Sequence, residues 1–114
     1  METDIYATGK FIPLSAQKVR LIADLVRGKG VVDALTLLKF TPNRAADPVS
    51  KVLASAMANG EENFGVSRDD LYIYRIVADE APTRKWRRFG ARGRFKPLLR
   101  RSSHITVILR ERQA

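Results

Sequence analysis

Cysteine is absent from the 114 residues, and His104 is the single histidine. Without cysteine there is neither a disulfide framework nor a thiolate metal site, and one histidine without a positioned nucleophile does not make a catalytic centre. The glycines fit no phosphate-binding loop, because GxxxxGK followed by Ser or Thr does not occur. We therefore expect no metal, no cofactor, no small-molecule substrate and no enzyme activity.

Long hydrophobic runs are also missing. No apolar stretch approaches the roughly 20 residues that span a bilayer, and the first residues, METDIYATGKF, are acidic where a targeting peptide is basic. With 114 residues and 45% hydrophobic side chains, the chain suits one compact domain and is too short for two. We expect a soluble protein of a reducing compartment, with no membrane partner.

Acidic residues are lacking where basic residues cluster. Residues 84–101 hold nine of the 21 basic side chains and no acid, so that 12 basic residues face 12 acids in the rest of the chain. Because clustered cations repel one another, this segment favours a polyanionic partner. Trp86, Phe89 and Phe95 lie among the charges and offer planar surfaces for unstacked bases. The cations are Arg84, Lys85, Arg87, Arg88, Arg92, Arg94, Lys96, Arg100 and Arg101.

Apolar spacing predicts a strand and two helices in the first forty residues. Residues 4–12 alternate weakly, which indicates an edge strand that ends at Pro13. A stripe at i, i+3, i+4 and i+7 from Val19 predicts a helix over 15–27, with Ser15 as its N-cap and Gly28 after its end. A second, short helix is expected from Val31, closing before the proline at position 42.

A third helix follows, and prolines complicate its start. Thr41 as cap with Pro42 in the first helical position opens it, unless Pro48 kinks it or moves its start to Asp47 as cap. We expect this helix to end near Gly60.

From residue 71 the apolar period becomes two, which predicts strands. Residues 71–79 form one strand, and residues 104–110 form its natural partner. In the first strand the side that includes Ile76 is expected to hold Tyr72, Tyr74 and Ala78. In the second, one face is expected to hold Ile105, Val107 and Leu109.

The connection between these strands, residues 81–102, is too long for an ordinary loop. Within residues 88–96 basic and apolar positions alternate, so an extended ribbon would have one cationic face and one apolar face. We expect both strands to continue as a protruding β-hairpin arm about 30 Å long. The fold prediction is α+β: one domain over 1–114, with a three-stranded antiparallel sheet and about three helices in a globular body of 1–80 and 103–114, and the arm at 81–102.

RNA suits such an arm better than DNA, because no predicted helix carries a basic face for a major groove. Three alternatives remain open from the residues alone. The chain could be a stand-alone nucleic-acid regulator or chaperone, or a nucleic-acid enzyme with His104 or an acid pair as base. Binding to an anionic membrane surface ranks last, because Gly90, Gly93 and Pro97 oppose the amphipathic helix it would need.

Six segments together resemble the bacterial L-twenty-two family of large-subunit ribosomal proteins: SAQKVRLIADLVRGK, ALTLLKFTPNRAA, KVLASAMANGEEN, DEAPTRK, ARGR and RRSSHITVIL. They cover nearly the whole chain in the family's order. The resemblance implies a structural component of the ribosome in the cytoplasm, which binds large-subunit ribosomal RNA during early assembly beside neighbouring large-subunit ribosomal proteins. It also implies that the tip of the arm lines the nascent-peptide exit tunnel and meets the nascent peptide.

The resemblance implies two sets of site residues. The family's S-P-x-K-x-R signature matches Ser15, Lys18 and Arg20, with Ala16 in place of the proline. These three are expected to bind RNA together with arm residues Arg84, Lys85, Trp86, Arg87, Arg88, Phe89, Arg92, Arg94, Phe95, Lys96, Arg100 and Arg101. The tunnel-facing tip is expected at Arg84, Lys85, Trp86, Arg87, Arg88, Phe89 and Gly90, where Trp86 and Phe89–Gly90 depart from the usual family residues.

Overall fold

The computed structural model describes residues 4–82, 84–89 and 95–112, with side chains for 4–82 and 101–112. Its centre is β5 (Ser103–Glu111), whose residues alternate between buried and half-buried positions. β5 pairs antiparallel with β1 (Ile5–Ile12) on one side and with β2 (Leu71–Glu80) on the other. The predicted three-stranded antiparallel sheet, with the N-terminal strand at an edge, is therefore confirmed.

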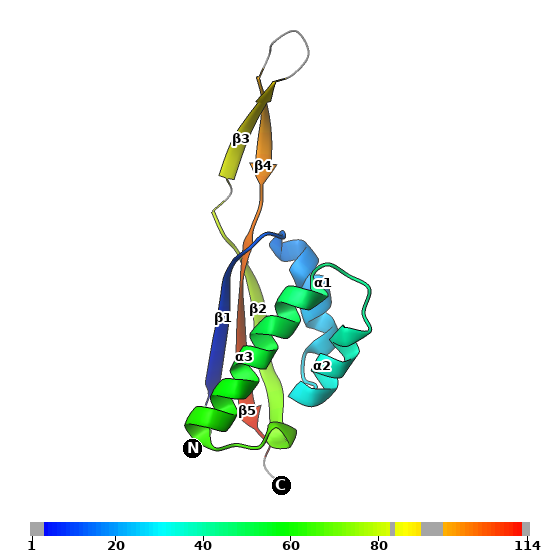
Figure 1. Ribbon diagram of the computed structural model, residues 1–114, viewed down its shortest axis with the longest axis vertical. Helices are drawn as coiled ribbons and strands as arrows, with labels where there is room; N and C mark the ends of the chain where they lie inside the picture. Colours follow the sequence, from blue (N-terminus) through cyan, green and yellow to red (C-terminus); the bar gives the residue numbers. More distant parts are fainter. Residues whose placement is uncertain (1–3, 83, 90–94, 113–114) are drawn as a thin grey trace.

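Three helices cover one face of this sheet (Figure 1): α1 (Ala16–Val26), α2 (Val31–Lys39) and α3 (Ala46–Phe64). Each helix buries the apolar stripe that its spacing predicted, against the alternating residues of the strands. The side chains at the centre of this core are fully buried and include Val19, Val49, Leu53, Ile105 and Leu109. The α+β class is confirmed.

The start of α3 differs from both predicted positions. The helix begins at Ala46, and Asn43 organises the turn before it: the Asn43 side-chain oxygen accepts from the Ala45 N–H at 2.9 Å, and its carbonyl accepts from the Ala46 N–H at 3.1 Å. Neither Thr41 nor Asp47 is the cap. Pro48 is the third helical residue, where a backbone N–H has no partner within the helix, so its lack of a donor is tolerated there.

The end of α3 was also predicted wrongly. Gly60 is an interior residue of the helix, and Gly65, with a φ of 65°, ends it by donating its N–H to the Gly60 carbonyl. Gly60 is buried beside the sheet, where a Cβ would stand 2.9 Å from Leu71 Cδ1 and 3.3 Å from Ile5 Cδ1. The glycine at position 60 therefore serves close packing between helix and sheet, and a 3₁₀ turn, η1 (Arg68–Asp70), follows the helix.

The faces of β2 change at a β-bulge. The register runs from Ile73 opposite Leu109 to Arg75 opposite Ile108, so Tyr74 is an extra residue. Because one extra residue reverses the alternation, Leu71 and Ile73 are buried before the bulge, and Ile76 and Ala78 after it. The prediction that Tyr72 and Tyr74 share a side with Ile76 was therefore wrong.

A second, two-stranded sheet lies between β2 and β5 in the sequence. β3 (Arg84–Phe89) and β4 (Phe95–Arg100) pair antiparallel over six residue pairs. Figure 1 shows this ladder beyond the end of the three-stranded sheet, away from the helices. One further hydrogen bond, from the Ala81 N–H to the Ser102 carbonyl at 3.0 Å, extends the pairing of β2 and β5 toward it.

Candidate nucleic-acid interface

The β3–β4 ladder sets basic residues opposite one another. Arg84 is the register partner of Arg100, and Arg88 is the partner of Lys96, while Phe89 pairs with Phe95. Like charges directly opposite one another destabilise an antiparallel pair. Six of the ladder's twelve residues are basic and none is acidic, so the pairing gains from an external anion.

The ladder contains most, but not all, of the residues that the sequence predicted for the interface. The backbones of Arg84 to Phe89 and of Phe95, Lys96 and Arg100 lie in β3 and β4, and their side chains lie outside the described part. Gly90, Arg92 and Arg94 lie wholly outside the described residues. Arg101, at the base of the ladder, is exposed.

The start of α1, the helix of these predicted residues, lies near the end of the sheet from which the ladder extends (Figure 1). Ser15 is the N-cap of α1, and its Oγ accepts from the Lys18 N–H at 3.5 Å, as predicted. The side chain of Lys18 is exposed in the first turn. Ser15 thus has a structural task, whereas Lys18 presents its charge to solvent.

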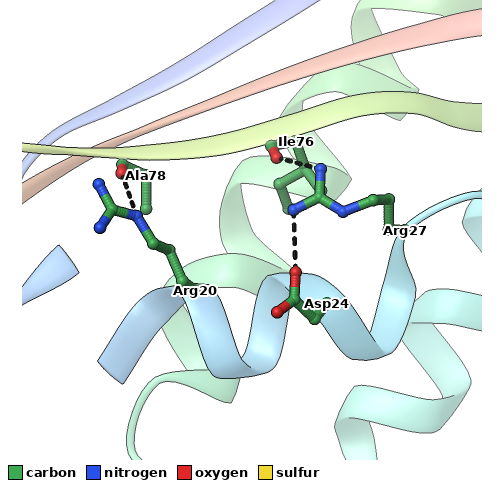
Figure 2. Close-up of polar contacts among 5 residues, drawn as sticks. All are labelled: Arg20, Asp24, Arg27, Ile76 and Ala78. Atoms are coloured by element: carbon green, nitrogen blue, oxygen red, sulfur yellow. Dashed lines mark hydrogen bonds and ion pairs between the residues drawn. The ribbon is translucent and has the colours of Figure 1, made fainter. Parts of the chain in front are cut away.

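Arg20 contacts the edge of the sheet (Figure 2). Its Nε donates to the Ala78 carbonyl of β2 at 3.0 Å. Seven residues further along the chain and on the same helix face, Arg27 Nη1 donates to the Ile76 carbonyl at 2.8 Å, and its Nη2 pairs with Asp24 at 3.0 Å. A concavity of about 270 Å³ lies between α1 and β2 at these residues.

Arg27 was not among the predicted site residues. Positions 20 and 27 are seven residues apart, so both lie on one helix face, and that spacing was the available signal. After Arg27 the chain itself meets the edge of β2, because the Gly28 N–H donates to the Ile73 carbonyl and the Lys29 carbonyl accepts from the Ile73 N–H. Backbone groups along β2 are therefore occupied, which protects an edge strand from pairing with another chain.

His104 lies on the sheet face opposite the helices. Its Nδ1 accepts from the Phe11 N–H at 3.1 Å, and the two rings meet edge to face with centroids 4.8 Å apart. Phe11 has a φ of 54°, in the left-handed region, beside the irregular register of β1. The histidine therefore supports the backbone at this point of β1.

The described residues form neither a metal site nor a membrane-spanning helix. No group of three or more His, Asp or Glu side chains there is placed to hold a metal ion. Among the helices in the same part of the chain, none combines the length and apolarity needed to cross a membrane. The described features define a class: a small α+β protein with a basic two-stranded extension and helix-to-sheet arginine contacts.

Comparison with known proteins narrows this class to one family. The profile of the family described as ribosomal protein L22p/L17e matches residues 7–110. Large ribosomal subunit protein uL22 of Pediococcus pentosaceus is 47% identical over 111 residues, 97% of this chain and 94% of the relative. The proteins of that name from Thermoanaerobacter sp. strain X514 and Cutibacterium acnes are 48% and 46% identical, over 94% and 96% of this chain and 96% and 71% of theirs.

The chain belongs to the ribosomal protein L22p/L17e family. It is a structural ribosomal protein of the large subunit and not an enzyme, so the resemblance read from the sequence is confirmed. The alternative of a nucleic-acid enzyme based on His104 was wrong.

Proposed function

We propose that this protein binds large-subunit ribosomal RNA with a basic arm, residues 81–102, while a globular body of residues 1–80 and 103–114 holds the arm in place. The observation that carries the proposal is the register of the ladder, in which Arg84 faces Arg100 and Arg88 faces Lys96. Such pairs oppose folding of the ladder alone and favour it among phosphates. Binding thereby supports early assembly of the subunit, because phosphates that crowd as RNA folds are neutralised.

The aromatic positions of the arm add a second kind of contact. Trp86, Phe89 and Phe95 are interleaved with the charges, and a base stacked on an aromatic ring contributes about 1–3 kcal/mol. Arginine adds bidentate bonds to phosphate. The proposed RNA-binding residues are those predicted from the sequence: Ser15, Lys18, Arg20, Arg84, Lys85, Trp86, Arg87, Arg88, Phe89, Arg92, Arg94, Phe95, Lys96, Arg100 and Arg101.

Among these, Arg20 is proposed to have two roles, one in the fold and one in RNA binding. Its Nε bond to Ala78 orients the guanidinium, and the outer nitrogens of the group are the part that would meet phosphate. Ser15 contributes by fixing the first turn of α1, which presents Lys18. The body would thus place two cations near the base of the arm.

The tip of the arm, from Arg84 to Gly90, is proposed to reach the wall of the nascent-peptide exit tunnel and to meet the nascent peptide. A slender two-stranded ribbon suits this task, since it can enter where a globular body cannot. Family membership supports the proposal, and a cytoplasmic ribosome is its setting.

A salt series tests the electrostatic basis of the proposal. We expect the affinity of the full-length protein for naked large-subunit ribosomal RNA to fall about 10³-fold or more between 50 and 200 mM salt, because about six to nine neutralised phosphates release counterions. A nearly flat salt dependence would contradict the arm's role. Co-sedimentation of the protein with large subunits washed at high salt, at one copy per particle, checks stable incorporation and excludes a stand-alone regulator.

The tunnel contact requires a separate experiment. A photoreactive amino acid in place of Trp86 is expected to crosslink to a stalled nascent peptide, whereas the same group in place of Lys39, an exposed residue at the end of α2, is not. Crosslinks from position 86 to RNA alone would remove the tunnel contact and leave RNA binding in place.

A further inference from the structure

The sheet face opposite the helices is open and carries aromatic, basic and hydroxyl side chains. Across the three strands, Tyr6 lies opposite Ile108, which lies opposite Arg75. In the next row Thr8 lies opposite Thr106, which lies opposite Val77. We call this surface the open face; none of its six residues is buried, whereas the residues between them in the strands form the core.

Two tyrosines on the edge strands of the open face expose a large part of their surface. Tyr6 is 56% exposed and Tyr74, the extra residue of the β2 bulge, is 46% exposed. Alternation from the buried Ile73 puts Tyr74 on this face, and the bulge brings Arg75 to the same face beside it. The two rings come from outer strands whose backbones lie about 10 Å apart, with the central strand between them.

A fixed stack of charged and aromatic groups occupies one end of the face. Arg110 lies over the Tyr74 ring, with Cζ 3.4 Å from the ring centroid, and its Nε bonds Asp4 at 2.6 Å. The hydroxyl of Tyr6 donates to the other oxygen of Asp4 at 3.5 Å. These contacts hold planar groups in place before any partner arrives, which lowers the entropy cost of binding.

The size of the open face indicates the kind of partner. β5 has nine residues, about 30 Å in length, and three strands occupy a width of about 14 Å, so the face covers about 400 Å². A specific protein–protein interface needs about 800 Å² per partner. A few unstacked nucleotides need much less, and they are read by sheets that present aromatic rings, arginines and hydroxyl groups.

The charge of the open face and its position beside the ladder also favour nucleotides as the partner. Asp4 is paired with Arg110. The exposed side chains of Lys10 and Arg75 add two positive charges, which outnumber the negative charge of Asp79, the register partner of His104 on the same face. β2 and β5, which form two of its three strands, are the strands that lead toward the basic ladder. RNA that follows the ladder therefore meets the open face without leaving the protein.

We propose that the open face is a second RNA-binding surface, which takes unpaired nucleotides of the large-subunit ribosomal RNA by stacking on Tyr6 and Tyr74 and by a phosphate contact from Arg75. The inference rests on the proposed function and adds to it a site apart from the arm and from Ser15, Lys18 and Arg20. Because stacking and phosphate contacts respond differently to salt, the two kinds of contact are separable.

The test compares Tyr6→Ser and Arg75→Gln in the full-length protein with Leu21→Ser and Lys39→Gln on the helix layer. Leu21 is 64% exposed and Lys39 is exposed, so the controls remove matched groups from the other side of the molecule. We expect Tyr6→Ser to weaken binding to naked large-subunit RNA about fivefold or more at unchanged salt slope. Arg75→Gln is expected to lower the slope of log affinity against log salt by about 0.7, and both controls to change affinity less than twofold.

A conservative variant distinguishes stacking from a loss of fold. Tyr6→Trp is expected to bind at least as tightly as the parent protein, since the larger ring stacks better, and all variants are expected to keep the parent's thermal unfolding curve. If both open-face variants bind naked RNA as the helix-layer controls do, the inference is overturned. Should the same variants also be depleted from assembled subunits, the open face would contact a neighbouring protein and not RNA. The proposed function fails separately, if removal of the arm leaves RNA affinity unchanged.

Discussion

The helix-covered sheet and the β3–β4 ladder are both antiparallel, yet different forces act in them. In the sheet, pairing brings apolar residues into one buried layer: Ile73 lies opposite Leu109, and Ile76 opposite Val107. In the ladder, the same kind of pairing brings Arg88 opposite Lys96. The first arrangement gains free energy from burial of apolar surface, whereas the second loses free energy until an anion is added. The comparison agrees with the proposal that the sheet folds by itself and that the ladder binds an anionic partner.

Replacement of residues 84–100 by a short Gly-Ser linker removes the ladder, and we expect it to have the largest effect on RNA affinity. RNA affinity in 50 mM salt should fall by about three orders of magnitude, because eight of the nine clustered cations are lost. The unfolding temperature measured by circular dichroism should stay that of the parent, since the buried apolar residues lie elsewhere. A collapsed body in this variant would show that ladder and sheet do not fold separately.

The opposite result is expected from Leu53→Ala. Leu53 is fully buried in α3 within the core, and truncation of such a side chain costs about 2–5 kcal/mol of unfolding free energy. Urea denaturation measures the loss, and RNA affinity should be unchanged wherever the protein remains folded. Leu21→Ala, at an exposed position of α1, is the control and should cost less than about 0.5 kcal/mol.

A smaller effect is expected where the helix meets the edge of β2. Arg27→Met removes the bond to the Ile76 carbonyl while keeping much of the side-chain volume. The expected loss is about 1–2 kcal/mol in urea denaturation, because a hydrogen bond from a charged donor is removed from a half-buried site. Arg44→Met, on an exposed residue before α3, serves as the control. Equal stability of both variants would show that the edge contact contributes nothing measurable.

The periodicity of the sequence was sufficient for most of the body. Helix α1 begins and ends at the residues that Ser15 and Gly28 indicate, because capping is a local interaction between neighbours in the chain. β5 was predicted with its buried face correct, since Ile105, Val107 and Leu109 alternate without interruption. The pairing of β2 with β5 followed from their spacing.

Tertiary contacts decided the features that the sequence did not reveal. The bulge at Tyr74 allows apolar residues before and after it to be buried in the same core. No local signal in the sequence marks the extra residue. Gly60 resembled a helix stop, yet its role depends on Leu71 and Ile5, which are distant in the chain. The start of α3 depends on Asn43, whose side chain competes with the predicted caps for the turn.

The candidate site also has a part that the sequence predicted and a part that depends on tertiary contacts. Composition was enough to find the basic segment, because charge is a property of the residues themselves. The contact of Arg20 with Ala78 and the unpredicted contact of Arg27 depend on how α1 lies against β2, which periodicity does not fix. The surface formed by Tyr6, Arg75 and Ile108 exists only after three distant strands have paired.

The smallest expected effect is the most direct measure of the contrast between sheet and ladder. Lys96→Glu turns the pair with Arg88 from like to opposite charge, which should stabilise the free ladder by about 0.2–1 kcal/mol. Amide hydrogen exchange of β3 and β4 in the free protein should therefore slow down, while affinity for RNA decreases because a cation is replaced by an anion. Lys96→Gln, which only removes the repulsion, should lie between the parent and Lys96→Glu in both measurements. If Lys96→Glu instead strengthened both the ladder and its binding to RNA, the repulsion between paired cations would not be the reason that the ladder needs a partner.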